Sequence, residues 1–231
     1  INVRKIIKFK IMNKNKIEIV ILGGSGLIGK CLIKEFLNKN TKILNLDLTD
    51  KISKNENYFF EKFNMTNNDL EKKLSNIFKK YQIPRVFIDC SYLNRIFFKN
   101  TSIKKISKNN LDLILKNWLS SSVVITGYFL NKMKKSNIKG SIILTSSIYG
   151  VIAQDTNIYK RTGMVDNIAY TIVKSGINNF VKNAAVIFGE FGIKVNSICP
   201  GGVYSKKDKN FKNKIFIKNY ISKVPLRRFA K

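Results

Sequence analysis

The sequence contains no histidine, and it has only three cysteines and three prolines among its 231 residues. Without histidine the chain cannot build an imidazole zinc site, and it cannot carry out Ser-His-Asp or Cys-His catalysis. The cysteines, Cys31, Cys90 and Cys199, lie far apart and include no C-x-x-C pair, which is typical of unpaired thiols in a reducing cytosol. We therefore expect a cytoplasmic protein with no bound metal.

Acidic residues are also scarce. The chain has 14 Asp and Glu against 43 Lys and Arg, which gives a formal net charge of +29. The basic residues are scattered, and no basic helix carries the interleaved aromatic residues that nucleic-acid readers use. No apolar run approaches the roughly 18 residues that a membrane span requires. We expect a solvated surface, with neither a specific nucleic acid nor a membrane as partner.

The length and composition fit one domain. The chain is 44% hydrophobic, which is enough for one core, and no stretch rich in Pro, Gly or Ser marks a linker. Residues 1–11 are basic and partly apolar, and Met12 comes just before the first regular apolar segment. We expect residues 1–11 to be a disordered extension and residues 12–231 to form a single domain.

Short apolar runs rich in β-branched residues alternate with longer segments of helical periodicity. This alternation is typical of βαβ units, whose parallel strands need right-handed crossovers and helices on both faces of the sheet. The sequence therefore predicts an α/β fold with a doubly wound parallel sheet of Rossmann type. Strands are predicted at 17–22, 42–48, 58–63, 85–91, 141–147 and 193–198, and helices near 27–39, 68–81, 108–135 and 169–188.

Residues 23–29 read GGSGLIG, between the first predicted strand and the first predicted helix. Glycines at such a join let the chain turn sharply, let backbone N–H groups approach a pyrophosphate, and let the helix pack on the sheet with its N-terminus facing the phosphates. The alternative is a structural turn. The predicted phosphate-binding segment comprises Gly23, Ser25, Gly26, Leu27, Ile28 and Gly29.

A carboxylate follows the second predicted strand. Asp47 ends the strand about 20 residues after the glycines, the spacing of a dinucleotide-binding fingerprint. There it would accept hydrogen bonds from a ribose diol and repel a 2′-phosphate, which favours NAD over NADP. Asp50 and the nearby lysines leave NADP open.

Candidate catalytic residues lie in the second half of the chain. Tyr170 and Lys174 are four residues apart and therefore share a helix face. An ammonium beside a phenol stabilises the phenolate, so the pair could exchange a proton with a substrate hydroxyl or carbonyl. Ser147 ends a buried strand at the edge of the sheet where α/β proteins bind ligands, and it could hydrogen-bond the reacting oxygen.

These motifs, in this order, resemble the short-chain dehydrogenase/reductase family. The series runs from the spaced glycines and Asp47, through the Ser-Ser pair after the fifth strand and Y-x-x-x-K on the next helix, to CPGG after the sixth strand. The resemblance covers residues 17 to about 230 and points to the single-domain branch. It implies a domain that binds NAD, with NADP as the alternative.

The resemblance also implies a role for each matching residue. Tyr170 would be the general acid/base, Lys174 would lower its pKa and hold the nicotinamide ribose, and Ser147 would orient the substrate. The backbone of Val203 would bond the nicotinamide carboxamide. The remaining cofactor-binding residues would be Asp89, Cys90, Ser91, Pro200, Gly201 and Ser205.

The sequence departs from the family pattern at several places. The fourth strand ends IDCSY, where members read Asn-Asn-Ala-Gly, which would alter the adenine-side wall. Val124 is expected to replace an asparagine that supports a proton-relay water. The interval of 23 residues from Ser147 to Tyr170 is about ten longer than usual and is expected to form a flap over the substrate. The chain stops where members add a further helix and strand, so we expect a domain lacking those two elements.

The predicted activity is hydride transfer between NAD(H) and a hydroxyl or carbonyl carbon of a small molecule. The longer loop resembles members encoded with bacterial surface-polysaccharide and flagellin-glycan genes, which suggests a sugar or nucleotide-sugar substrate. One alternative is a nucleotide-sugar epimerase or dehydratase that retains its NAD. Another is a non-catalytic NAD(P)-binding protein. A homo-oligomer is expected only if the C-terminal elements are present.

Overall fold

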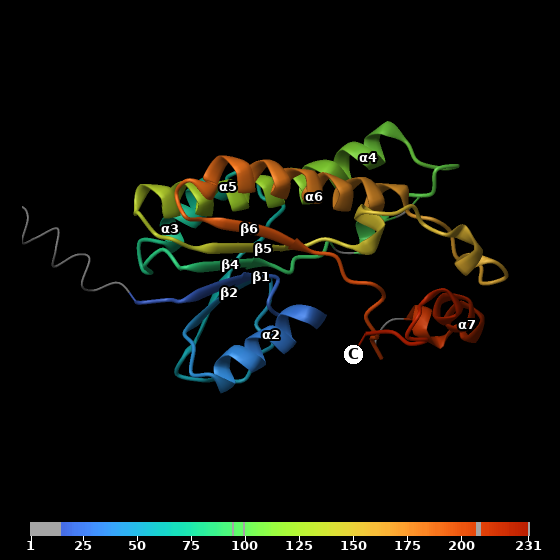
Figure 1. Ribbon diagram of the computed structural model, residues 1–231, viewed down its shortest axis with the longest axis horizontal. Coiled ribbons are helices and arrows are strands. Elements are labelled where there is room, and N and C mark those ends of the chain that lie inside the picture. The colour runs from blue at the N-terminus through green and yellow to red at the C-terminus, as the bar shows by residue number, and fades with distance from the viewer. Residues whose placement is uncertain (1–14, 94, 99, 207–208, 231) are drawn as a thin grey trace, which may run out of the picture.

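The computed structural model describes residues 15–93, 95–98, 100–206 and 209–230. The predicted extension, 1–11, lies outside the described residues. Six parallel strands form one sheet in the order β3-β2-β1-β4-β5-β6, so the sequence prediction of a doubly wound α/β sheet is confirmed (Figure 1). The strands are β1 (Ile19–Leu22), β2 (Ile43–Asp47), β3 (Tyr58–Lys62), β4 (Val86–Asp89), β5 (Ser141–Thr145) and β6 (Lys194–Ile198).

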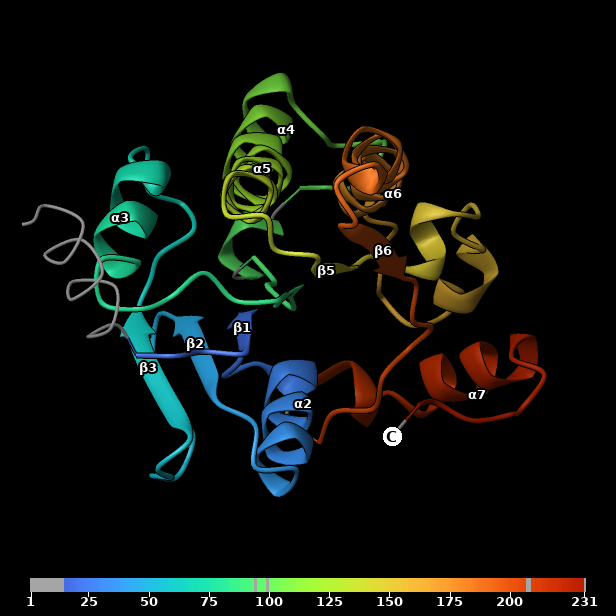
Figure 2. The same cartoon turned by 60° about the vertical axis from the view of Figure 1, so that its left-hand side comes forward.

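Helices cover both faces of the sheet. Figure 2 shows α2 on one face and α3, α4, α5 and α6 on the other. The loop between β2 and β3 has no helix in the described structure. The α-helices are α2 (Leu27–Asn38), α3 (Leu70–Ile77), α4 (Lys108–Ile114), α5 (Ser121–Lys135), α6 (Ile168–Gly189) and α7 (Lys214–Lys223).

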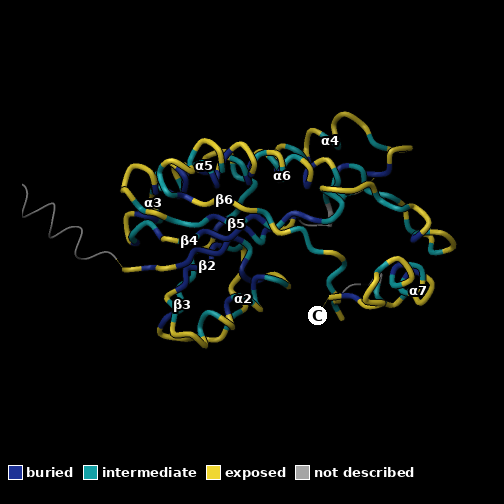
Figure 3. The backbone as a smooth tube through the Cα atoms, viewed as in Figure 1, coloured by how far each residue is buried: buried dark blue, intermediate teal, exposed yellow. Residues whose placement is uncertain are grey.

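Apolar side chains fill the space on each side of the sheet. The larger core joins the sheet to α3, α5 and α6 and contains Phe87, Trp118 and Phe129, each with no exposed surface. The smaller core lies under α2 and is built mainly of isoleucines such as Ile21 and Ile33. Strand β1 is therefore buried along its whole length, and β4 is buried from its second residue on (Figure 3). A sheet held so firmly keeps the carboxyl ends of β1, β4 and β5 in fixed positions.

The long helix predicted at 108–135 is interrupted. It comprises α4, a π-helical turn η2 (Leu115–Ser120) and α5. By length and composition alone, residues 108–135 could cross a membrane, but 56% of the apolar window is buried inside the protein. The helix packs against α3 and α6, so in this fold it is a core helix.

The sequence analysis missed α7. This helix starts at Lys214 after Asn213, whose side chain accepts a hydrogen bond from the amide of Phe216. It packs against a short 3-10 turn, η4 (Thr156–Tyr159), from the long interval before α6. We call their shared apolar core the outer aromatic cluster; it consists of Ile158, Phe216, Tyr220 and Phe229.

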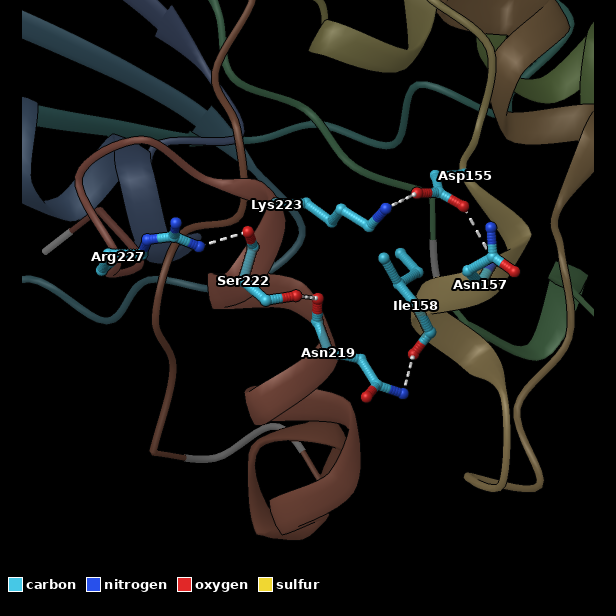
Figure 4. Close-up of polar contacts among 7 residues, drawn as sticks. All are labelled: Asp155, Asn157, Ile158, Asn219, Ser222, Lys223 and Arg227. Atoms are coloured by element: carbon cyan, nitrogen blue, oxygen red, sulfur yellow. Dashed lines mark hydrogen bonds and ion pairs between the residues drawn. The ribbon is translucent and has the colours of Figure 1, made fainter.

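Polar contacts join the same two segments (Figure 4). Lys223 forms an ion pair with Asp155 at 3.1 Å, and the amide of Asn219 donates to the carbonyls of Ile158 and Lys160. The interval between β5 and α6 and the segment after β6 thus form one substructure beyond the end of the sheet. The apolar core of this substructure is separate from the two cores of the sheet.

Candidate functional site

The glycine-rich loop lies where β1 passes into α2, at the carboxyl end of the sheet. Gly23 has φ +76°, a left-handed conformation that favours glycine, and a Cβ there would lie 2.7 Å from the backbone of Ser91. A Cβ on Gly29 would lie 2.5 Å from the carbonyl oxygen of Gly23. Gly26 differs, because it is exposed and its Cβ would meet only that carbonyl, at 3.1 Å. Two glycines therefore close the turn, while Gly26 leaves space at the N-terminus of α2.

That space fits a pyrophosphate. The N-terminus of α2 has no acidic residue in its first turn, and its N-cap, Gly26, makes no side-chain capping bond. Leu27 is exposed and Ile28 half-buried beside it. Unpaired N–H groups and the positive end of the helix dipole favour an anion at such a position. The residues of the loop therefore suit the phosphate-binding role predicted for them.

A buried asparagine anchors this loop, and the sequence analysis did not identify it. Asn45 of β2 is fully buried, and its side-chain oxygen accepts a hydrogen bond from the amide of Gly24 at 3.0 Å. Its amide nitrogen donates to the hydroxyls of Ser25 (3.1 Å) and Tyr58 (3.0 Å). The Tyr58 hydroxyl in turn donates to Asp50 at 2.7 Å. An amide within a run of buried apolar residues was the available signal, because a buried polar side chain needs partners.

Asp47 lies beside the glycine-rich loop, as its position at the end of β2 predicts. One carboxylate oxygen accepts a hydrogen bond from the amide of Ser25 at 2.9 Å, and the other accepts from the amide of Leu48 at 2.7 Å. The carboxylate is partly exposed. It therefore presents a fixed negative charge next to the opening at Gly26.

Ser147 and Tyr170 meet at the carboxyl end of β5. Ser147 is buried, and its hydroxyl accepts a hydrogen bond from the amide of Tyr149 at 3.2 Å. It also lies near enough to the phenol of Tyr170 to lower the pKa of that phenol. Tyr170 lies in the first turn of α6, where the N-cap Asn167 accepts a hydrogen bond from its amide. Strand end and helix start are thus each fixed by a capping side chain. The two hydroxyls predicted to face one substrate oxygen therefore lie in the same region of the site.

Lys174 follows one turn later on α6 and is 3% exposed. Its ammonium donates a hydrogen bond to the carbonyl of Thr145 at 2.7 Å and lies 5.8 Å from the centre of the Tyr170 ring. Burial lowers the pKa of Lys174 to about 8, while the negative charge of Asp89 opposes this shift. The predicted trio of Ser147, Tyr170 and Lys174 is therefore brought together.

The phenol does not show the pKa predicted for it. Burial raises the pKa of Tyr170, the hydrogen bond from Ser147 opposes the rise, and Lys174 is not among the groups that shift it. Desolvation of the phenol is the largest effect on this pKa, and the Lys174 ammonium is bonded to the carbonyl of Thr145. That Lys174 lowers the pKa of Tyr170 stays a prediction for the complex with the cofactor.

The asparagine expected at position 124 lies elsewhere. Val124 is on α5 with 40% of its side chain exposed, so it does not face Lys174. Asn117 is buried in the π-helical turn, directly before Trp118, whose ring lies under the Lys174 ammonium. A π turn alters the 3.6-residue periodicity by which helix faces are assigned, so the face on which Val124 lies could not be predicted from its position in the sequence.

The end of β4 lines the same region. Asp89 is buried and accepts a hydrogen bond from the amide of Ser91, whose backbone packs against Gly23. Burial raises the pKa of the Cys90 thiol to about 11, so this cysteine is not a thiolate nucleophile. Tyr92 does not lie on an adenine-side wall as predicted. Its ring is 6.4 Å from that of Tyr170 and is 58% exposed, which places it at the reacting end of the site.

The segment after β6 also reaches the site. The carbonyl of Pro200 accepts a hydrogen bond from the amide of Ile148, next to Ser147. Gly201 is exposed, and the amide of Gly202 donates to the hydroxyl of Tyr220 in α7. Val203 pairs with Ala230 in a parallel bridge, and Ser205 follows, half-buried. The predicted nicotinamide-side residues thus lie in the segment that connects β6 to the outer aromatic cluster.

The sequence and the fold are both similar to known oxidoreductases. A family model described as enoyl-(acyl carrier protein) reductase matches residues 66–231. Post-translational flagellin modification protein A of Campylobacter coli is 30% identical over 220 residues, covering 88% of this chain and 83% of the relative. A 3-oxoacyl-(acyl-carrier-protein) reductase of Buchnera aphidicola is 25% identical over 226 residues, covering 95% and 86%.

A solved structure extends this similarity to the cofactor. The short chain dehydrogenase of Leptospira borgpetersenii with bound NAD+ superposes with a TM-score of 0.80 at 26% identity, covering 96% of this chain and 83% of that one. The match spans the glycine-rich loop, the trio on β5 and α6, and the segment after β6, so a nicotinamide cofactor suits the site. On these matches, the chain is an oxidoreductase that belongs to the short-chain dehydrogenase/reductase family.

Proposed function

We propose that the protein transfers a hydride between NAD(H) and a hydroxyl or carbonyl carbon, with Tyr170 as general acid/base. One observation carries this proposal: Ser147 at the end of β5 and Tyr170 in the first turn of α6 lie near each other, one helical turn from the buried ammonium of Lys174. The dinucleotide supplies the hydride chemistry, and the chain supplies position and proton transfer.

Each residue has a task in this reaction. The hydroxyl of Ser147 would bond the substrate oxygen and orient it toward the phenol. The phenol oxygen of Tyr170 would give a proton to a carbonyl oxygen or take one from a hydroxyl. Lys174 would hold a ribose and provide the positive charge that compensates a phenolate, and Asn117 would support the relay that returns the proton to solvent. Burial of all four in or beside the core excludes competing water.

Asp47 supports NAD rather than NADP. Its carboxylate is held beside the opening at Gly26 by the amides of Ser25 and Leu48, so it cannot turn away without losing both bonds. A 2′-phosphate at the adenosine ribose would bring two negative charges close to a third. The hydroxyls of an unphosphorylated ribose would instead donate to this carboxylate.

A cyclic sugar is the substrate class that we propose. The exposed ring of Tyr92, beside the ring of Tyr170, offers an apolar face to the C–H face of a pyranose. The similarity to a flagellin modification protein of Campylobacter coli supports the same class. Tyr92→Ala should therefore raise KM for the sugar at least roughly tenfold with little change in kcat, because the lost contact is made equally in ground and transition states. An unchanged KM would remove this assignment.

The experiment that tests the activity is Tyr170→Phe. This change keeps the shape of the ring and removes the only oxygen that can transfer the proton. Affinity for NADH should stay within about twofold, whereas turnover of sugars and alcohols should fall by about 10² to 10⁴-fold. The chain has a single tryptophan, Trp118, so NADH binding can be followed by energy transfer from its indole. Unchanged turnover in Tyr170→Phe would refute the mechanism.

Two other functions use the same site. If the protein is an epimerase or dehydratase that retains NAD, it should purify with tightly bound dinucleotide and produce no net NADH. A non-catalytic binder would take up NADH and turn over no substrate. Extraction of the purified protein, followed by chromatography of the released nucleotide, separates the first alternative from a dehydrogenase, and the sugar screen separates the second.

A further inference from the structure

Trp118 occupies the centre of the site without having a role in the reaction described above. Its side chain is fully buried in the π-helical turn, where it follows Asn117. The Lys174 ammonium lies over its ring at 4.5 Å from the ring centre. The ring is also 5.8 Å from that of Tyr170 and 5.1 Å from that of Tyr92. One side chain thus contacts the lysine, the general acid/base and the proposed substrate wall.

The geometry points to Trp118 as a positioning residue that holds the Lys174 ammonium on the face of its indole through a cation–π interaction. The ring face of tryptophan carries more negative potential than that of any other side chain, and 4.5 Å is within the distance at which this attraction acts. The contact is desolvated on both sides, since Lys174 and Trp118 are both buried. Under these conditions the attraction is stronger than at a surface.

Two features argue against a role in packing alone. The indole N–H of Trp118 is buried and has no hydrogen-bond partner among the described residues, which costs stability that a leucine or phenylalanine would not incur. The ammonium has only one hydrogen-bond acceptor in the described contacts, the carbonyl of Thr145. The indole therefore supplies a second favourable partner for a charge that burial otherwise penalises.

The other groups that face Lys174 set the background against which the indole acts. They are Asp89 and Cys90 at the end of β4 and Cys199 after β6. The negative charge of Asp89 favours the charged lysine, whereas the Cys90 thiol, with a pKa of about 11, is neutral near pH 8. Tyr170 lies 5.8 Å away on the same helix. Burial of the ammonium opposes the effect of Asp89. Because the cation–π contact stabilises the charged form, weakening it must lower the pKa of Lys174.

Fluorinated tryptophan tests this inference without changing the shape of the core. Trp118 is the only tryptophan in the chain, so growth on mono-, di-, tri- or tetrafluorotryptophan alters this ring alone. Each fluorine withdraws electron density from the ring face. The pKa of Lys174, followed by ¹³C NMR of ε-labelled lysine, should fall stepwise, by about one unit over the series. A pKa that stays constant across the series would overturn the inference.

Phe98→Leu is the matched control. Phe98 packs on Trp118 with ring centres 5.7 Å apart, and no contact between Phe98 and Lys174 is among the described ring interactions. The change should lower the thermal midpoint and leave the Lys174 pKa in place. If it lowers that pKa as much as the fluorine series does, general loosening explains both and the inference is wrong.

The functional consequence rests on the proposed role of Lys174 in holding the cofactor. At pH values between the shifted and the original pKa of Lys174, the fluorinated proteins should bind NADH roughly tenfold more weakly than the unmodified protein, and binding should recover at lower pH. The NMR titration needs no cofactor. A stepwise fall in the Lys174 pKa without any NADH binding would therefore support the indole contact and reject the proposed function. NADH binding with a constant Lys174 pKa would reject the indole contact and leave the proposed function in place.

Discussion

Asn45 offers the sharpest test of how the fold prepares the glycine-rich loop. We expect Asn45→Val to fill the same space in β2 while removing the acceptor for Gly24 and the donor for Ser25 and Tyr58. The Gly24 amide would then be buried without a partner, which costs about 1–3 kcal/mol. The hydroxyls of Ser25 and Tyr58 keep their bonds to Thr49 and Asp50. Loss of the two bonds from Asn45 to these hydroxyls therefore adds only about 1 kcal/mol in total.

The total of about 2–4 kcal/mol corresponds to a fall of roughly 5–15 °C in the thermal midpoint of a domain of this size. Circular dichroism melting would measure it, and titration with NADH should show affinity at least about tenfold weaker, because the Gly24–Ser25 segment loses its anchor. Tyr58→Phe is the control, since it removes the two bonds of the Tyr58 hydroxyl and keeps the bonds from Asn45 to Gly24 and Ser25. A midpoint for Asn45→Val within about 2 °C of the unmodified protein would refute the reasoning.

Three further predictions concern the cofactor. Gly26→Val should abolish NADH binding, measured by fluorescence, and keep the melting midpoint within about 3 °C, because the added side chain meets only one carbonyl at 3.1 Å; retained affinity would make the loop a simple turn. Asp47→Ala should shrink the preference for NADH over NADPH in competition titrations, and equal affinities in the unmodified protein would contradict the assignment. NADH affinity should be constant at neutral pH and fall as pH rises through about 8, since the pKa of Lys174 is lowered and the lysine loses its charge there; a fall at acidic pH instead would exclude Lys174 as the group responsible.

Much of the fold could be predicted from the sequence. All six strands were placed within a few residues, because each is a short apolar run bounded by turn residues, and parallel strands buried on both faces give this pattern. The trio of Ser147, Tyr170 and Lys174 followed from local rules, a strand end and a four-residue helical spacing. These rules hold because each depends only on the position of a residue within its own strand or helix.

The parts that could not be predicted depend on contacts between distant elements. The pKa of Tyr170 rises because the phenol is desolvated, with its ring packed near those of Tyr92 and Trp118, and no motif records how much water these distant residues exclude. Tyr92 was assigned to the adenine side because its neighbours in sequence are cofactor residues, yet its ring turns toward Trp118. The π-helical turn that positions Asn117 leaves no signal in hydrophobic periodicity except a change of phase. Helix α7 was overlooked because its apolar face covers only the outer aromatic cluster.

The outer aromatic cluster has a consequence for the order in which the molecule opens. The hydrogen bond from Asn219 to Ile158 joins residues that are 61 positions apart in the sequence. Since α6 and β6 lie between these residues, we expect the contact to form only after α6 and β6 have packed. We expect this substructure to exchange its amide hydrogens through local opening, at a lower free energy than the strands of the sheet. Since the amide of Gly202 donates a hydrogen bond to the hydroxyl of Tyr220, each opening would free the segment that we propose to line the nicotinamide end. If NAD(H) binds there as we propose, local opening of α7 would then limit the rate at which the dinucleotide product dissociates.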